Sequence, residues 1–166
     1  MGIKTSTGDI SGDIVATKSV PDFSQEDLEK VLTKFLGRQK QIPPMYSAIK
    51  IGGEKLYQLA RRGKEVEREA RDIEIYALEI LGFNLQDLRL RVECSKGTYI
   101  RTLGEDIAVA LGTVGTMAKL VRTKVGKFNL SESHTLEEIR EKEGGTYGIG
   151  AYGQLSGSPA TREQAV

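Results

Sequence analysis

The spacing of apolar residues predicts two amphipathic helices. In Ser24–Leu36 the apolar positions are three or four residues apart, at Leu28, Val31, Leu32, Phe35 and Leu36. Ser24 and Asp27 have the spacing of a capping box at the start of this helix, and Gly37 follows its end. A second helical spacing covers Ile100–Leu111. Each helix is therefore expected to bury one face in a core.

Alternation of apolar and polar residues predicts strands elsewhere. The stretches with this pattern are Ile14–Thr17, Arg71–Ile80, Leu85–Cys94 and Leu120–Phe128. Gly82 and Asn84 lie between the second and the third stretch and predict a hairpin there. Shorter helical patterns occur at Lys55–Arg62 and after Thr135, which forms a capping box with Glu138.

Together these elements predict an α+β fold. The hairpin over 71–94 and the strands near Ile14 and Leu120 make a mostly antiparallel sheet, flanked by the helices at 24–36 and 100–111. At 166 residues the chain is long enough to bury a core of its own, and we expect one domain over residues 1–143. Residues 144–166 are Gly-rich and then small and polar, which predicts a disordered tail or a segment foreign to the domain.

The stretch Cys94–Thr102 joins a predicted strand to a predicted helix. It places the ammonium of Lys96, the phenol of Tyr99 and the guanidinium of Arg101 at a helix N-terminus, where unpaired backbone N–H groups and the helix dipole favour an anion. A simpler interpretation also fits this corner by itself, namely a helix start with a solvated Arg and an amphipathic Tyr.

The composition indicates a soluble protein of a reducing compartment. The single cysteine, Cys94, has no partner for an intramolecular disulfide. No apolar run approaches the roughly 20 residues that cross a bilayer, and no segment near Met1 resembles a signal peptide. The expected location is therefore the cytoplasm.

Positive charge is concentrated in one segment. The formal net charge is only +1, but Arg38–Arg71 holds nine Lys and Arg against four Glu, with Tyr46 and Tyr57 among them. Cations bind phosphates and aromatic rings stack on unpaired bases, so this composition suits RNA. Pro43 and Pro44 exclude a helix at its start. A solvated surface loop whose tyrosines pack on the body has the same composition.

Several strings resemble the bacterial TruB-type tRNA pseudouridine synthases. The two longest are Gln41–Lys50, which reads QIPPMYSAIK, and Cys94–Arg101, which reads CSKGTYIR. Shorter matches occur in the same order as in the family, at Gly2, Thr5, Thr7, Asp9, Leu56, Tyr57, Ala60, Arg61, Gly63, Val66, Glu67, Arg71, Leu120, Arg122, Gly126 and Phe128. The resemblance covers about Gly2 to Ile139 and excludes the tail.

The resemblance implies an RNA-modifying isomerase that uses no cofactor and no metal. Members convert one uridine in the T-loop of tRNA to pseudouridine, after the base has left the stack. It implies that Gln41–Arg71 is a thumb-like insertion that grips the T-arm. It also implies that Tyr99 contacts the flipped base, that Arg101 pairs with the catalytic aspartate and that Leu120 packs at the target base. The expected RNA contacts are Tyr46, Lys50, Lys55, Tyr57, Arg61, Arg62, Arg71, Lys96 and Arg122.

The chain departs from the family pattern at its start. In the family the catalytic aspartate lies in an N-terminal Gly-Thr-Leu-Asp-Pro string, and no aspartate of this chain lies in such a string. Asp106 follows Arg101 by five positions on the predicted helix, so the two point roughly 140° apart. We therefore expect the C-terminal part of a catalytic domain that is inactive alone. Its uncovered sheet edge and apolar face predict self-association or pairing with the missing half.

Two other interpretations stay open. The chain is then either an RNA-binding module that performs no chemistry, or a structural domain whose uneven charge only keeps it in solution. Binding to a T-arm without turnover favours the first of these, and the absence of salt-sensitive RNA binding favours the second.

Overall fold

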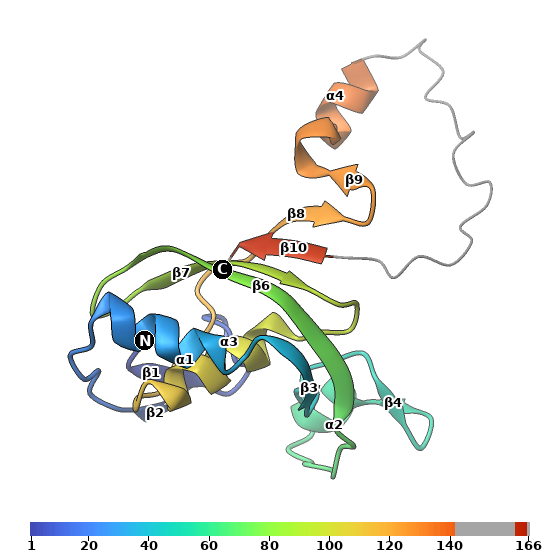
Figure 1. Cartoon of the computed structure of the whole chain (residues 1–166). Helices are drawn as coiled ribbons and strands as arrows, with labels where there is room; N and C mark the ends of the chain where they lie inside the picture. The colour runs from blue at the N-terminus through green and yellow to red at the C-terminus, as the bar shows by residue number, and fades with distance from the viewer. Residues whose placement is uncertain (142–161, 166) are drawn as a thin grey trace.

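The structure is a computed structural model that describes residues 1–141 and 162–165. In chain order the elements are β1 (Ile3–Thr5), β2 (Ile14–Thr17), α1 (Gln25–Thr33), β3 (Gly37–Gln41), β4 (Lys50–Ile51), β5 (Glu54–Lys55), α2 (Leu56–Arg61), β6 (Arg71–Phe83), β7 (Leu88–Cys94), α3 (Ile100–Ala110), β8 (Val121–Val125), β9 (Phe128–Asn129), the 3-10 helix η1 (Leu130–Glu132), α4 (Leu136–Glu141) and β10 (Arg162–Ala165). Figure 1 shows α1 and α3 together beneath the β6–β7 hairpin.

A sheet in the order β3-β6-β7-β10-β8-β9 forms the centre of the fold, and each neighbouring pair in it is antiparallel. β6 and β7 make the predicted hairpin, with Ile75 opposite Cys94 and Phe83 opposite Leu88. The predicted α+β class with a mostly antiparallel sheet is therefore confirmed.

The core lies between this sheet and helices α1 and α3. Successive side chains of a strand point to opposite faces, so β7 buries Leu90, Val92 and Cys94 while Arg89 and Arg91 are exposed. The helices contribute the apolar positions that their spacing predicts, chiefly Leu28, Leu32, Leu103 and Ile107.

Helix α1 begins where the capping box predicts. The Asp27 N–H donates to Ser24 Oγ at 3.1 Å, and the Ser24 N–H donates to Asp27 Oδ2 at 3.0 Å. The helix ends at Thr33, earlier than predicted, and Leu36 is 45% exposed instead of buried. Gly37, with a φ of +84°, then turns the chain into β3.

Several strand assignments differ from the prediction. β2 (Ile14–Thr17) pairs with β1 in a separate two-stranded sheet and not with the main sheet. β3 was not predicted, because its sequence Gly-Arg-Gln-Lys-Gln has no apolar residue; it forms by backbone pairing along β6. The stretch Leu120–Phe128 is divided by a turn at Gly126 into β8 and β9.

The thumb-like insertion over 41–71 has structure of its own. Its β4–β5 hairpin turns at Gly52 and Gly53, both with positive φ, and leads into α2. Leu56 is buried on α2, and its N–H donates to the carbonyl of Ile49 at 2.8 Å. The insertion leaves the sheet at the end of β3 and returns at the start of β6, so it lies beside one edge of the molecule (Figure 1).

The part of the chain with β9, η1 and α4, residues 128–141, forms an arm that extends away from helices α1 and α3 (Figure 1). Its exposed apolar residues are Phe128, Leu130, Leu136 and Ile139. Of the predicted tail over 144–166, residues 162–165 form β10 instead of irregular chain, and the remainder of that prediction lies outside the described residues. The described helices include none that is long and apolar enough to cross a membrane.

Candidate functional site

Arg101 on the first turn of α3 binds three oxygen atoms from two distant segments. Its Nη1 donates to the carbonyl of Thr7 at 3.0 Å and to Oδ2 of Asp9 at 3.1 Å. Its Nη2 donates to the carbonyl of Tyr46 at 2.7 Å. The guanidinium therefore joins the N-terminal loop, the thumb-like insertion and α3 at one point.

Asp9 is the carboxylate partner of Arg101, a role that the sequence did not assign. The Thr7 hydroxyl donates to Asp9 Oδ1 at 2.9 Å, and the N–H and hydroxyl of Ser11 donate to the same oxygen. The hydrogen bonds from Ser11 lower the pKa of the Asp9 carboxyl most, Thr7 and the positive charge of Arg101 lower it further, and partial burial opposes them. Asp9 is therefore ionised at neutral pH, with both oxygens already bound.

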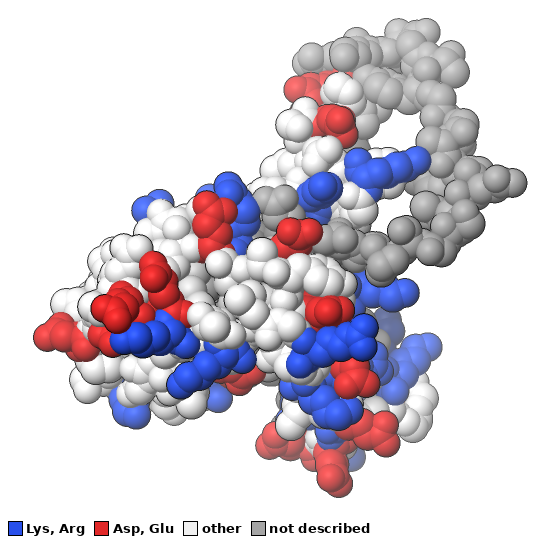
Figure 2. Space-filling view, in the orientation of Figure 1, with Lys and Arg blue, Asp and Glu red and all other residues white. Residues whose placement is uncertain are grey.

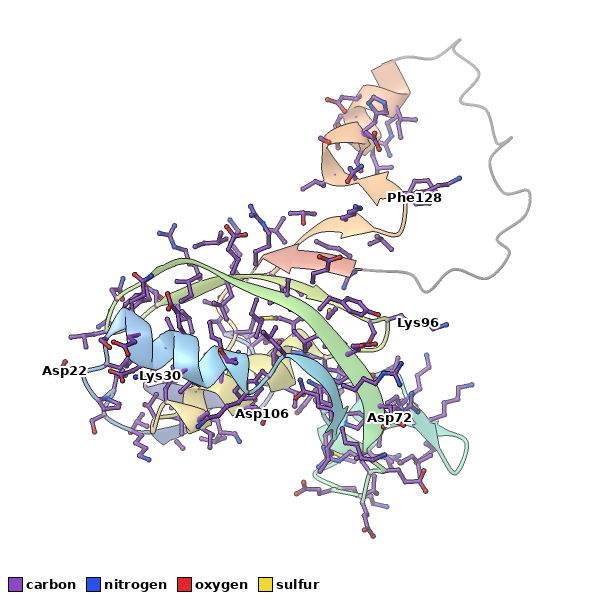
Figure 3. The ribbon with its side chains drawn as sticks, in the orientation of Figure 1. Asp22, Lys30, Asp72, Lys96, Asp106 and Phe128 are labelled. Carbon is purple, nitrogen blue, oxygen red and sulfur yellow. The ribbon has the colours of Figure 1, made fainter. Side chains whose placement is uncertain are left out.

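Asp106 lies outside this cluster, as its position on the helix predicts. It is exposed on α3 (Figure 3), and Arg101 forms its ion pair with Asp9 instead. Partial burial raises the pKa of Asp106, and the negative charge of Glu105 raises it further. Asp106 is thus no substitute for a carboxylate at Arg101.

Tyr99 is held at the helix start by a buried amide. It is the N-cap residue of α3, and its backbone N–H donates to Gln41 Oε1 at 2.8 Å. Gln41 Nε2 donates in turn to the carbonyl of Tyr99 at 3.1 Å. Gln41 is 5% exposed at the end of β3, so its side chain fixes Tyr99 to the base of the thumb-like insertion. The sequence pattern gave no signal for this contact.

A cavity of about 320 Å³ lies beside Arg101. It is lined by the N-terminal loop from Lys4 to Gly8, by Ile42–Tyr46 and by Arg101, Thr102 and Glu105 of α3. Arg68 reaches this cavity from the returning side of the insertion and donates to the carbonyl of Pro43 at 3.2 Å. The cavity therefore borders the same three segments that the Arg101 guanidinium joins.

The predicted RNA contacts of the insertion form a mixed cationic and aromatic surface. The Tyr57 ring has Lys55 Nζ at 5.6 Å and the Arg61 guanidinium at 5.4 Å from its centroid. Arg62 pairs with Glu54 at 2.5 Å, while Lys50 and Arg71 are exposed. Figure 2 shows Lys and Arg gathered over this part of the molecule, with Asp and Glu between them.

The remaining predicted site residues are separate from the Arg101 cluster. Lys96 is exposed on the loop before α3 (Figure 3), Leu120 is 36% exposed just before β8, and Arg122 is exposed on β8. In the described part of the chain none of the three shares a hydrogen bond or ion pair with Arg101.

The fold places the chain in a structural class that a solved structure shares. The solved structure described as "Crystal Structure of a Cbf5-Nop10-Gar1 Complex" is similar over 68% of this chain and 29% of that chain, with a TM-score of 0.53 and 30% sequence identity. The chain therefore shares its arrangement of sheet and helices with part of a chain in that complex.

Sequence comparison identifies the family. Residues 1–100 match the profile of the TruB family pseudouridylate synthase N-terminal domain, and residues 101–144 match that of the tRNA pseudouridylate synthase B C-terminal domain. The chain belongs to the TruB family of pseudouridylate synthases.

Curated relatives agree with the family profiles. The tRNA pseudouridine synthase B of Francisella tularensis subsp. tularensis is 51% identical over 142 residues, which are 85% of this chain and 47% of the relative. That of Psychrobacter cryohalolentis is 48% identical over 139 residues, or 84% of this chain and 39% of the relative. The chain thus spans less than half the length of these relatives.

Proposed function

We propose that this chain is the RNA-gripping part of a tRNA pseudouridine synthase that acts on a T-loop uridine in the cytoplasm. The reaction breaks the bond from ribose C1′ to uracil N1 and forms one from C1′ to C5, while C5 loses a proton and N1 gains one. The observation that carries the proposal is the Arg101 cluster, in which one guanidinium binds both a carboxylate and the insertion.

Arg101 retains the capacity to orient a further carboxylate. A guanidinium has five N–H donors, and three of those on Arg101 are used by Thr7, Asp9 and Tyr46. Two donors therefore remain, within the described residues, for a catalytic aspartate. Asp9 itself suits a holding role better than a nucleophilic one, because its oxygens already accept hydrogen bonds from Thr7, Ser11 and Arg101.

The other site residues divide into base contacts and backbone contacts. Tyr99 supplies a ring to the flipped base from a position that Gln41 fixes, and Leu120 packs against the base. The tyrosines and cations of the insertion bind the T-arm, since stacked rings and charged groups hold unpaired bases and phosphates together. The residues assigned to this grip are Tyr46, Lys50, Lys55, Tyr57, Arg61, Arg62, Arg71, Lys96 and Arg122.

The experiment that tests this proposal uses a T-arm RNA hairpin. Binding is measured by fluorescence anisotropy at several salt concentrations, and pseudouridine formation is measured on the same hairpin. We expect the binding to be salt-sensitive, because cations of the insertion contact phosphates. We expect no turnover, because the described residues place no catalytic carboxylate on the two remaining N–H donors of Arg101. A hairpin of equal length and unrelated sequence is the control.

Other outcomes have definite meanings. Turnover by the chain alone would contradict the expectation that the nucleophile lies outside it. Equal binding to both hairpins, without turnover, would favour the alternative of a non-catalytic RNA-binding module. The hydrogen bonds that both Asp9 oxygens already accept are compatible with that alternative, because they leave Asp9 in a structural role. Absence of salt-sensitive binding would remove the proposed function.

A further inference from the structure

Two cations lie over the ring of Tyr57 in the thumb-like insertion. Lys55 Nζ is 5.6 Å from the ring centroid, and the Arg61 guanidinium carbon is 5.4 Å from it. Both distances fall within the range of about 6 Å at which the face of an aromatic ring attracts a cation. One ring therefore gathers two positive charges on a short segment of the insertion.

The backbone around Tyr57 is anchored within the insertion. The Tyr57 N–H donates to the carbonyl of Ser47 at 3.1 Å, and the N–H of Leu56 donates to the carbonyl of Ile49 at 2.8 Å. Leu56 is fully buried, and Tyr57 itself is half-buried. The ring thus has a fixed place on α2. Long side chains that lie over a fixed ring lose less conformational entropy when a ligand binds them.

The acidic residue next to Lys55 is already paired elsewhere. Glu54 accepts a hydrogen bond from Arg62 Nη2 at 2.5 Å, and Arg62 Nε also donates to the carbonyl of Gln58 at 3.3 Å. Among the described residues no ion pair of the insertion includes Lys55 or Arg61. The pair between Glu54 and Arg62 therefore leaves two positive charges for a negatively charged ligand.

Two parts of an RNA suit a site made of a ring and cations. A base stacks on an aromatic face, whereas a phosphate binds to cations. A base on the Tyr57 ring has to compete with Lys55 and Arg61 for that ring, but a phosphate binds without displacing either of them. The arrangement therefore favours the phosphate.

We propose that Tyr57 is a positioning residue, whose ring holds Lys55 and Arg61 as a clamp for phosphate groups of the RNA backbone, and that it does not stack on a base. This inference rests on the proposed RNA grip. The clamp binds paired and unpaired RNA alike, because phosphate contacts carry no sequence information. The described cation–ring contacts include none at Tyr46, so that ring is the one left for a base.

The first experiment compares two RNAs, the T-arm hairpin and a blunt duplex of the same stem sequence in which every base is paired. Affinity and its salt dependence are measured by fluorescence anisotropy with the whole chain. We expect Tyr57→Leu to weaken binding to both RNAs by the same factor, about three- to tenfold, and to reduce the salt slope by about one. A loss confined to the hairpin would show that the ring stacks on an unpaired base, and would overturn the proposal.

Other substitutions separate the ring from its hydroxyl and from general effects of losing a tyrosine. Tyr57→Phe keeps an aromatic face for both cations, so binding should stay within about twofold of that of the unsubstituted chain. Tyr76→Leu makes the matched change at a 40% exposed position of β6, outside the insertion, and should leave binding unchanged. Equal losses from Tyr57→Phe and Tyr57→Leu would assign the effect to the hydroxyl and overturn the proposal.

A double-mutant cycle tests whether Tyr57 acts through the two cations. In a chain that already carries Lys55→Ala and Arg61→Ala, Tyr57→Leu should change the affinity by less than about twofold, since no cation remains for the ring to hold. The same loss in both backgrounds would show that the ring acts independently of the cations, and would overturn the proposal. Tyr57→Met, which fills similar space without an aromatic face, gives a second cycle with the same expected result.

Hydrogen exchange at the Leu56 N–H, which donates to Ile49, reports whether each variant keeps the insertion folded. The outcomes also separate this proposal from the proposed function. Absence of salt-sensitive binding of the unsubstituted chain to either RNA would remove the RNA grip and the clamp together. Salt-sensitive binding that Tyr57→Leu and Tyr57→Met both leave unchanged would keep the grip and overturn the clamp alone.

Discussion

Arg101 and Asp9 show how a single contact connects distant segments. They are 92 positions apart in the sequence, and their ion pair is partly buried, with 23% and 26% of the two side chains exposed. The pair also draws in the carbonyls of Thr7 and Tyr46. Loss of the Asp9 charge should therefore loosen the N-terminal loop, whereas the hydrogen bond from Arg101 to the Tyr46 carbonyl continues to hold the insertion.

Asp9→Asn tests how much the ionised Asp9 side chain contributes to the free energy of unfolding. Because the folded chain lowers the pKa of Asp9, its ionised form stabilises the fold above the ordinary carboxyl pKa of about 4, and this stabilisation is lost as the pH falls through the lowered pKa. We expect the variant to unfold about 1 to 3 kcal/mol more easily at pH 6, the scale of hydrogen bonds to charged groups. Urea unfolding at pH 6 and pH 3 measures this. A difference that does not shrink at pH 3 would contradict the assignment.

Gln41 offers a second test at the residue scale. Gln41→Met keeps the volume of the side chain but removes both hydrogen bonds to the Tyr99 backbone. The Tyr99 N–H then lacks this partner, whereas the Tyr99 carbonyl still accepts from the Leu103 N–H, so the change should cost roughly 1 to 3 kcal/mol of unfolding free energy. Gln25→Met, at an exposed position of α1, is the control and should change stability little. If the two variants lose similar amounts of unfolding free energy, the Gln41 hydrogen bonds do not contribute to stability as proposed.

At the element scale the insertion concentrates the cations that the proposed RNA grip needs. Its charges are not equivalent, because Arg62 already pairs with Glu54, whereas Arg61 lies over the Tyr57 ring. A phosphate gains more from a cation whose charge is not already neutralised. The insertion is thus expected to bind RNA chiefly through Arg61 and its unpaired neighbours.

Alanine substitutions separate these contributions. Arg61→Ala should weaken T-arm binding about three- to tenfold and reduce the salt slope by about one, and Arg62→Ala should have a smaller effect. Arg101→Ala should leave affinity nearly unchanged, because its proposed role is catalytic. Lys30→Ala on α1 is the control for lost charge, since Lys30 pairs with Glu26 away from the insertion. Equal losses from Arg61→Ala, Arg62→Ala and Arg101→Ala would remove this division of roles.

The elements with a strong apolar period could be predicted, and those without one could not. α1, α3 and the β6–β7 hairpin follow from residues such as Leu28, Val92 and Ile107, which are all buried. β3 has no apolar residue, and only its pairing with β6 makes it a strand. The place of β2 outside the main sheet also depends on pairing that no local pattern records.

The site residues also divide into those that a sequence pattern predicts and those that only the folded chain reveals. Tyr99 and Arg101 were predicted as site residues because one continuous string carries both and resembles a family. Asp9 and Gln41 act through contacts made across 92 and 58 positions of sequence, so only the folded chain reveals their partners. Long-range partners of this kind are set by topology and not by spacing.

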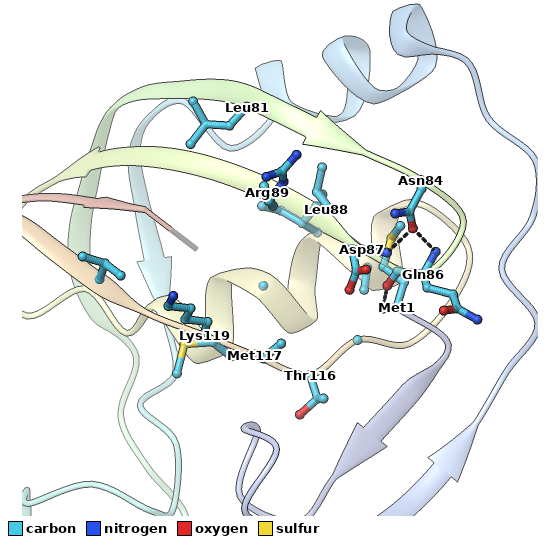
Figure 4. A pocket seen from close by; sticks show the side chains of 16 residues that line it. Met1, Leu81, Asn84, Gln86, Asp87, Leu88, Arg89, Thr116, Met117 and Lys119 are labelled. Atoms are coloured by element: carbon cyan, nitrogen blue, oxygen red, sulfur yellow. Dashed lines mark hydrogen bonds between the residues drawn. The ribbon is translucent and has the colours of Figure 1, made fainter.

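At the scale of the whole molecule, the main sheet organises the structure. Its interior includes the polar strand β10, which lies between β7 and β8. The chain spans less than half the length of the relatives that it matches. Beyond β10, Leu88–Leu90 of β7 pair with β6 on one side and with no second strand among the described residues, and a cavity of about 560 Å³ lies beside them (Figure 4).

The buried thiol of Cys94 makes the rate of opening of the fold measurable. It is the chain's single cysteine, it has 0% exposure, and it lies on β7 directly opposite the first residue of β10. A thiol reagent such as a dithiobis-nitrobenzoate reacts only in molecules whose sheet has opened at this point. The labelling rate of the unmodified chain therefore reports how often the core opens around β7.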